Sequence, residues 1–212
     1  SGVLKDIRET HRDKKIFILT TNPYVEILSR CPFVDGVLVD RRLPRWNIFY
    51  LLKLSKMLKK FNFSQVYDLQ NSSRTFFYKR YLLNISNWSS TRTIIKNIKK
   101  KEFDKDSVLL RFKHQLDKSN TKTEYTLNPD FSWACKNVDQ IVNKYFGKKF
   151  ILIFPFSSPK LSHKRWPYYN ELIKKIKLKY NNLEIATAPS FSEIEESKKI
   201  NAISILNNNK AL

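Results

Sequence analysis

The order of apolar segments most strongly limits the folds open to this 212-residue chain. Short apolar runs of strand length alternate with longer stretches in which apolar residues recur at helical spacing. Alternation of this kind is typical of parallel α/β units, in which each helix returns the chain to the start of the next strand. We therefore predict an α/β fold with parallel sheets.

The first half of the chain contains a regular series of these segments. An opening helix is expected around Val3, Leu4 and Ile7. The expected strands are residues 15–20 (KIFILT), 36–40 (GVLVD) and 65–69, and the expected helices are residues 24–30, 46–61 and 71–83. Short polar side chains at residues 71–73 can accept hydrogen bonds from free helix amides, so they are predicted as the N-cap of the last helix. Residues 84–128 are polar and basic and are predicted as loops around one short helix.

A second unit is predicted to begin after Gly147, where an amphipathic helix from Ala134 to Tyr145 is expected to stop. Its expected strands are residues 150–154, 183–187 and 202–206, and its expected helices are residues 168–180 and 192–200. The strand at 150–154 (FILIF) is apolar throughout and is predicted to be fully buried. We therefore expect two domains, residues 1–148 and 149–212, the second of them incomplete because the sequence ends before its sheet does.

The chain is strongly basic, with 40 Lys and Arg against 19 Asp and Glu and a net charge of +21. Two interpretations stay open: a compositional bias of an AT-rich genome, or a real anionic partner such as a membrane surface, lipid phosphate or nucleic acid. Cys31 and Cys135 are far apart and are predicted as buried, reduced thiols. The two Cys and three His show no ligand spacing, so no metal site is expected.

The segment 154–167 (FPFSSPKLSHKRWP) follows a predicted strand and precedes a predicted helix. Ligands of open α/β sheets bind beyond the carboxyl ends of the strands, which is where this segment begins. Ser157 and Ser158 offer hydroxyl groups, while Lys160, Lys164 and Arg165 offer positive charge, so the segment could hold a pyrophosphate. The alternative is a solvated basic loop in which Trp166 fixes the start of the helix.

The strand, the small-residue loop and the Lys-Arg-Trp-Pro start of a helix resemble the nucleotide-sugar domain of glycosyltransferase family 9, the ADP-heptose:lipopolysaccharide heptosyltransferases. Further segments are similar to the same family and follow in the same order. They are LTTNPY at 19–24, PFVD at 32–35, YDLQ at 67–70, SSR at 72–74 and RFKHQL at 111–116. The resemblance extends over nearly the whole chain.

This resemblance implies a GT-B architecture of two Rossmann-like domains facing a cleft, with the first strand of the N-terminal domain missing. It implies inverting, metal-independent and cofactor-free transfer of a heptose or related sugar from an ADP-activated donor to a lipopolysaccharide core or lipid A acceptor. The expected place is the cytoplasm, with peripheral contact to the cytoplasmic face of the inner membrane. Two alternatives stay open: a GT-B transferase that uses another nucleotide sugar, and a basic nucleic-acid-binding module, although nucleic acid is not the expected partner.

On the donor side, the resemblance implies that Lys164 stabilises the departing diphosphate while Ser157 and Ser158 bind its oxygens. Glu193 is the candidate for holding the ribose, with Glu195 and Glu196 as rivals. The alternative for Glu193 is an acidic residue that is favourable at a helix N-terminus.

On the acceptor side, the resemblance gives Gln70, Arg74 and Arg111 as binding residues. For Arg74 the alternative is a solvated basic helix face, and Asp68 is expected at a structural or acceptor-lining position. The family's Gly-Asp loop with the general base is expected before Ser1, and its Asp-Thr-Gly-Pro nucleotide motif beyond Leu212. We therefore expect no transferase activity from these 212 residues alone.

Overall fold

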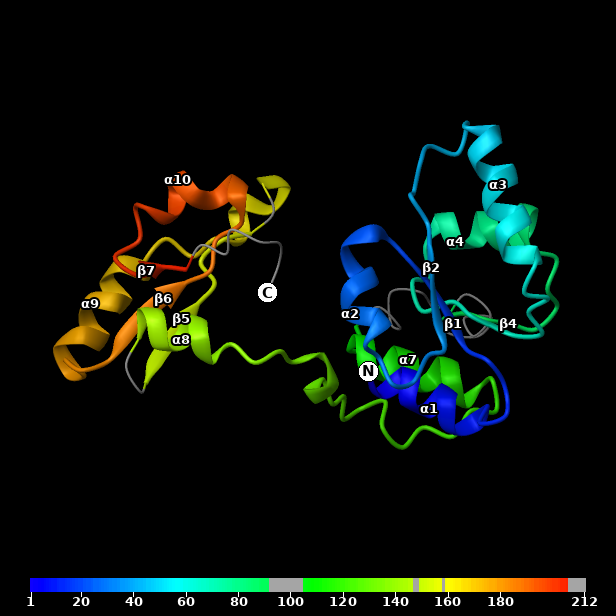
Figure 1. The fold of residues 1–212 in the computed structure, drawn as a ribbon, viewed down its shortest axis with the longest axis horizontal. Coiled ribbons are helices and arrows are strands. Elements are labelled where there is room, and N and C mark those ends of the chain that lie inside the picture. The colour runs from blue at the N-terminus through cyan, green and yellow to red at the C-terminus, as the bar shows by residue number, and fades with distance from the viewer. Residues whose placement is uncertain (92–104, 147–148, 158, 206–212) are drawn as a thin grey trace. The chain divides into compact units, whose positions relative to one another are not determined.

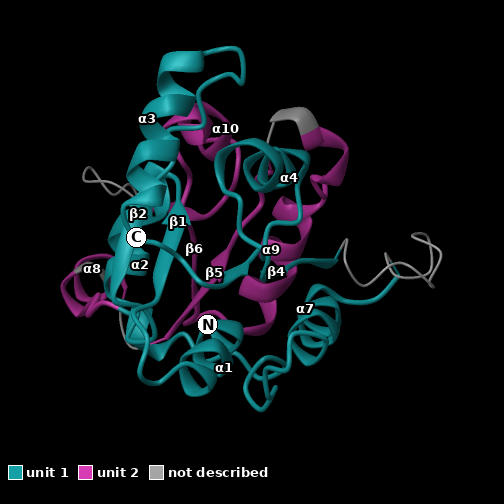
Figure 2. Cartoon of the chain, turned by 90° about the vertical axis from the view of Figure 1, so that its right-hand side faces the viewer, with its two compact units in different colours: residues 1–135 teal, residues 136–212 magenta. Residues whose placement is uncertain are grey.

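The computed structural model describes residues 1–91, 105–146, 149–157 and 159–205 (Figure 1). The chain forms two compact units, Ser1–Cys135 and Lys136–Leu212 (Figure 2). Both contain parallel strands and helices, so the predicted α/β class is confirmed. Within the described ranges, no helix is both long and apolar enough to cross a membrane.

The first unit holds two pairs of parallel strands. β1 (Phe17–Thr20) pairs with β2 (Gly36–Val39), and β3 (Val66–Tyr67) pairs with β4 (Trp88–Ser89). β4 lies in the segment that was predicted to form loops around one helix. It is only two residues long, and its pairing with β3 defines it as a strand.

The helices of the first unit agree with the predicted order. They are α1 (Gly2–Thr10), η1 (Asn22–Tyr24), α2 (Val25–Ser29), α3 (Ile48–Lys59), α4 (Ser73–Phe77), the π-helical η2 (Tyr78–Leu82), α7 (Val108–Asp117) and η4 (Ser132–Ala134). The predicted cap of α4 is confirmed, because the Ser72 side chain accepts a hydrogen bond from the Thr75 amide at 3.2 Å.

Helices pack against both faces of β3, because successive residues of a strand point to opposite sides. Val66 contacts the core cluster formed by α3, η2 and Trp88. Tyr67, the next residue, contacts the cluster formed by α1 and Leu116 of α7. β3 is therefore covered by different helices on its two faces, as expected in a parallel α/β unit.

The second unit contains a three-stranded parallel sheet in the order β5 (Phe150–Ile153), β6 (Glu184–Thr187) and β7 (Ile203–Ser204). Its helices are α8 (Asp139–Tyr145), η5 (Pro159–Lys164), α9 (Tyr169–Lys179), η6 (Phe191–Glu193) and α10 (Ile194–Ser197). The prediction that residues 150–154 form a fully buried strand is wrong, since Leu152 is 38% and Phe154 67% exposed. β5 is an edge strand, and β6 takes the buried central position.

The structure groups α8 with the second unit, whereas the sequence had placed the helix before Gly147 in the first. Val142 and Tyr145 of α8 pack on a cluster that contains Ala186 of β6 and Ile205. Gly147 itself lies outside the described residues. Among the cysteines, Cys31 is buried as predicted, but Cys135 is exposed and the prediction for it is wrong.

A buried carboxylate fastens α1 to the loop after α7. Asp6 is 1% exposed and accepts hydrogen bonds from the backbone amides of Glu124, Tyr125 and Thr126 at 2.8–3.2 Å and from the Thr126 hydroxyl at 2.6 Å. The loop lies so close to Gly2 that a Cβ there would collide with the Tyr125 backbone. This contact joins segments more than a hundred residues apart in sequence.

Replacing Asp6 by Ala should lower the free energy of unfolding of the first unit by about 3 kcal/mol, because four donors, two of them buried, lose their acceptor. Urea denaturation measures this loss. Glu9→Ala is the matched control on the same helix, where an exposed i,i+3 pair with Arg12 is broken at a cost below about 0.5 kcal/mol. Equal stability of the two variants would contradict the role of Asp6.

Candidate functional site

The candidate donor loop, residues 154–167, leaves the carboxyl end of the edge strand β5. It contains the short helix η5 and ends immediately before α9. The carboxyl end of β6 is next to that of β5, since Ile153 pairs with Thr187. The loop thus lies at the edge of the sheet where parallel α/β units place their ligands.

Arg165 holds this loop in place. One terminal nitrogen of its guanidinium donates to the Ser157 carbonyl at 3.0 Å, and the other forms an ion pair with Glu196. Ser157 belongs to the start of the loop, and Glu196 to α10 after the next strand. Because the guanidinium group is planar, rigid and always charged, it holds the Ser157 carbonyl and the Glu196 carboxylate in fixed positions relative to each other. Arg165 therefore has a structural role that the sequence did not distinguish from that of its neighbours.

Lys164 is exposed at the end of η5 and forms no ion pair with the described residues. Its ammonium group is therefore a free positive charge on a loop whose backbone is held by Arg165. Ser157 is half-buried, and its hydroxyl donates to the Leu161 carbonyl at 2.9 Å, which leaves the oxygen able to accept. Ser158 lies outside the described residues, and the structure does not describe the side chain of Lys160.

The three candidate glutamates differ in their contacts. Glu193 forms a capping box with Ser190, accepting from its amide at 2.9 Å and from its hydroxyl at 2.6 Å. This contact matches the alternative prediction of an acidic residue at a helix N-terminus. Glu196 pairs with Arg165, and the exposed Glu195 pairs with Lys198 at 2.6 Å. Each carboxylate has a local partner, and Glu193 contacts only its own turn.

Aromatic packing sets the start of α9. The Trp166 ring meets the rings of Tyr168 and Tyr169 edge to face, with centroids 5.9 and 5.2 Å apart. This agrees with the prediction that Trp166 fixes the helix start. The same strand edge also contains Thr187, which is fully buried and whose hydroxyl has no hydrogen-bond partner among the described residues.

On the first unit, a buried carboxylate organises the loop after β2. Asp40 is 4% exposed and accepts from the hydroxyls of Tyr50 and Tyr78, the latter at 2.7 Å, and from the Arg42 amide at 2.7 Å. Burial, and next the hydrogen bond to Asp40, raise the pKa of Tyr78 to about 12, against an opposing effect of Arg74. Burial and Asp40 also raise the pKa of Tyr50. Both phenols therefore stay protonated as donors.

Arg74, a predicted acceptor-binding residue, belongs to this network. It donates to the Tyr78 hydroxyl at 2.8 Å and to the Leu43 carbonyl at 2.8 Å. The guanidinium thus links α4 to the loop after β2 and is half-buried. The alternative prediction of a fully solvated helix face does not describe it.

Gln70 and Arg111 come from segments that meet at the end of β3. Asp68 is buried and accepts from the amides of Gln70 at 3.2 Å and Asn71 at 2.8 Å, which shapes the turn before α4. Gln70 is exposed on this turn, and Arg111 lies on α7, half-buried, one helical turn before Gln115. Asp68 therefore has the structural position that was predicted as one of its two alternatives.

Gln115 joins α7 to both strands of the β3–β4 pair and was not predicted. It is 0% exposed, and its amide donates to the carbonyls of Asp68 and Ser89, both at 3.1 Å. Its side-chain oxygen accepts from Asn71 at 3.2 Å. No local sequence pattern marks a buried glutamine, because its partners come from distant segments.

A cavity of about 1040 Å³ lies within the first unit and is lined by residues of both β1 and β3. In the part of the chain that the structure describes, these two strands do not pair with each other. Tyr67 on the wall of the cavity bonds to His11 at 2.8 Å, and burial, more than nearby Lys14, lowers the pKa of His11. Asp40, Asp68 and Gln70 also line this cavity.

Polar loops follow the carboxyl ends of parallel strands in both units, as in α/β proteins generally, and similarity to solved structures gives the fold of this chain as the GT-B type. Its fold is heptosyltransferase-like and of the kind found in glycosyltransferase family 9. No protein-family model matches the sequence, and no curated protein matches it significantly. The fold assignment therefore comes from solved structures.

Three solved structures illustrate the similarity. The E. coli ADP-heptose lps heptosyltransferase II has a TM-score of 0.63 at 17% identity, over 93% of this chain and 62% of that chain. The glycosyl transferase family 9 protein from Veillonella parvula DSM 2008 has a TM-score of 0.66 at 12% identity, over 99% and 65%. E. coli heptosyltransferase WaaC with ADP-2-deoxy-2-fluoro heptose has 0.65 at 14%, over 100% and 72%.

The TM-scores of 0.63 to 0.66 establish a shared fold, at sequence identities of only 12–17%. The present chain spans less than two thirds of the length of heptosyltransferase II, 62% of it. Groups of three or more His, Cys, Asp or Glu that could hold a metal are absent from the described ranges.

In a double-mutant cycle of unfolding free energies, measured by urea denaturation with Arg165→Gln and Glu196→Gln, the Arg165–Glu196 pair should show a coupling of about 1 kcal/mol. Its side chains are 25% and 46% exposed, so the pair is partly screened from water. The control cycle uses Lys198 and Glu195, which are 65% and 79% exposed and should couple by less than about 0.5 kcal/mol. Equal coupling in the two cycles would show that the ion pair of Arg165 with Glu196 does not hold the loop.

Proposed function

We propose that this chain belongs to an enzyme that transfers a heptose or related sugar from an ADP-activated donor to a lipopolysaccharide core or lipid A acceptor. The observation that carries the proposal is the free cation Lys164 on the β5 loop of a heptosyltransferase-like fold. A solved neighbour with this fold holds ADP-2-deoxy-2-fluoro heptose. The proposed reaction is inverting and uses no metal or cofactor.

In this mechanism an acceptor hydroxyl passes its proton to a general base and attacks the anomeric carbon in line as the bond to ADP breaks. The bonding electrons pass to the diphosphate, where negative charge grows in the transition state. Lys164 would stabilise that charge as a point charge, and Ser157 would hydrogen-bond a phosphate oxygen. Glu193 remains the proposed ribose ligand, at the expense of its contact with Ser190.

The proposed acceptor site uses Gln70, Arg74 and Arg111 of the first unit. Gln70 is exposed on a turn that Asp68 holds, so its amide is available to a sugar hydroxyl. Arg74 already uses donors for Tyr78 and Leu43, so it would contribute mainly charge to a phosphorylated sugar. The proposed place of action is the cytoplasmic face of the inner membrane.

We also propose that the first unit is a Rossmann-like domain whose sheet takes one further parallel strand between β1 and β3. The cavity of about 1040 Å³ supports this, because it follows both strands along their length. A strand there would satisfy backbone groups that face the cavity and would join the two pairs into one sheet.

The β1 amides that point away from β2 should exchange with deuterium roughly tenfold faster than the amides of Leu54 and Leu58, which are 3% exposed in α3 of the same unit. Residue-resolved NMR exchange measures this. Global unfolding is shared by both sets, so it cannot produce the difference. Equal protection would exclude an open strand edge at β1.

Lys164→Ala should weaken ADP binding roughly tenfold in isothermal titration, because a charge-assisted contact to the diphosphate is lost. The control Lys177→Ala removes an equal charge from the last turn of α9 and should leave binding unchanged. Thermal melts of both variants should match the unaltered chain. Full ADP affinity of Lys164→Ala would remove it from the site, and tighter binding of UDP than of ADP would favour a transferase with another nucleotide sugar.

A further inference from the structure

Four large apolar side chains stand in solvent around the N-terminal end of α3. Trp46, Ile48, Phe49 and Leu52 are 80%, 65%, 87% and 62% exposed. Their connection to β2 and the first turn of α3 project from the body of the first unit (Figure 1). Large exposed apolar side chains in a group mark a surface that binds a protein or a membrane. We call these four residues the α3 apolar cluster.

The amphipathic pattern of α3 explains why these side chains remain outside. Leu51, Leu54 and Leu58 recur at helical spacing on one face of α3, and this face is buried in the core. Phe49 and Leu52 point away from this face, and Ile48 lies at its border in the first turn, where it is 65% exposed. Asn47 fixes the start of the helix, since its side chain accepts from the Tyr50 amide at 3.0 Å. The core that anchors α3 therefore also directs the cluster outwards.

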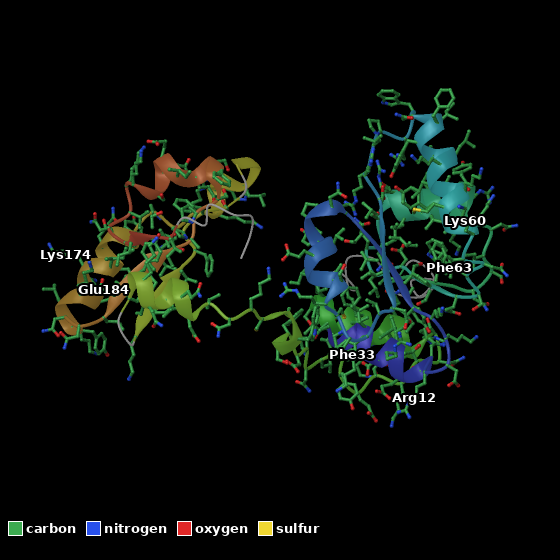
Figure 3. All side chains as sticks on the ribbon, in the orientation of Figure 1. Arg12, Phe33, Lys60, Phe63, Lys174 and Glu184 are labelled. Atoms are coloured by element: carbon green, nitrogen blue, oxygen red, sulfur yellow. The ribbon has the colours of Figure 1, made fainter. Side chains whose placement is uncertain are left out.

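The segment that carries the cluster is basic and contains no acidic residue. Residues 41–67 contain no Asp or Glu, and Asp40, just before them, is buried. The segment has seven basic residues, all exposed: Arg41, Arg42, Arg45, Lys53, Lys56, Lys59 and Lys60. The arginines precede α3 in the sequence, and the lysines lie within it and directly after it. Lys60 marks its far end (Figure 3). These charges would strengthen binding to a negatively charged partner surface but not to a neutral one.

We infer that this surface docks on a lipid bilayer rich in anionic headgroups. The α3 apolar cluster would enter the boundary between headgroups and acyl chains, where tryptophan is favoured, and the basic residues would face the lipid phosphates. A nucleic acid would match the charge and could stack on Trp46 and Phe49, but it would leave the aliphatic side chains of Ile48 and Leu52 in water, whereas a bilayer would bury all four. This inference rests on the proposed function in that it assigns the membrane contact to the α3 apolar cluster and the basic residues beside it. It does not depend on which sugar donor the protein binds.

Sedimentation with vesicles tests the inference. One vesicle set contains equal parts of phosphatidylcholine and phosphatidylglycerol, and the other phosphatidylcholine alone. The chain should bind the anionic set and shift its tryptophan fluorescence to shorter wavelength. The double variant Trp46→Ser, Phe49→Ser should bind roughly tenfold more weakly, because two membrane-inserting side chains are lost.

The matched control is Leu178→Ser with Phe191→Ser, two side chains of the second unit that are 79% and 70% exposed. It should bind vesicles like the unaltered chain, and thermal melts should show all variants folded. Equal vesicle binding by the Trp46, Phe49 variant and the unaltered chain would overturn the inference. It would also be overturned if that variant lost affinity for a single-stranded DNA oligonucleotide and not for vesicles, because the surface would then serve nucleic acid.

Discussion

Asp40 is a buried carboxylate on which the loop after β2 and the helices around it depend. Its oxygens accept hydrogen bonds from Tyr50 on α3, from Tyr78 on η2 and from the amide of Arg42. Burying a carboxylate without such donors is costly, so the loop after β2 cannot move independently of these helices. Arg74 extends the connection from Tyr78 to Leu43. The loop after β2, the start of α3, α4 and η2 are thus parts of one hydrogen-bonded assembly.

The order of strands and helices could be predicted because apolar spacing is a local property of the sequence. The Ser72 cap was predictable for the same reason, since it contacts a residue only three positions later. β4 could not be predicted, because Trp88–Ser89 becomes a strand only through its pairing with β3. The prediction that β5 is fully buried was wrong for the same reason, because the apolar composition of a strand does not reveal whether it lies at the edge of a sheet.

For residues of the candidate site, the sequence predicted which side chains are charged or polar, but not whether each has a structural or a ligand-binding role. Lys164 and Arg165 are adjacent cations, and only the position of Glu196, across a strand and a helix, assigns the structural role to Arg165. Gln115 gave no signal, because its partners Asp68 and Ser89 belong to two other segments. Glu193 was predicted as the ribose ligand, with a helix N-terminal acid as the alternative, and its contact with Ser190 is of the second kind. Long-range pairing therefore decides which polar residues remain available to a ligand.

The acid-free segment 41–67 also has a kinetic consequence. A protein held at a bilayer through the start of α3 would move laterally rather than through the bulk solution. Encounters with a lipid-borne acceptor would then depend on the number of acceptors per unit area and not on their volume concentration. Salt screens exposed charges over about 10 Å at 0.1 M, so ionic strength would control the time spent on the surface. The insertion of the aromatic side chains would contribute a part of the membrane affinity that does not depend on salt.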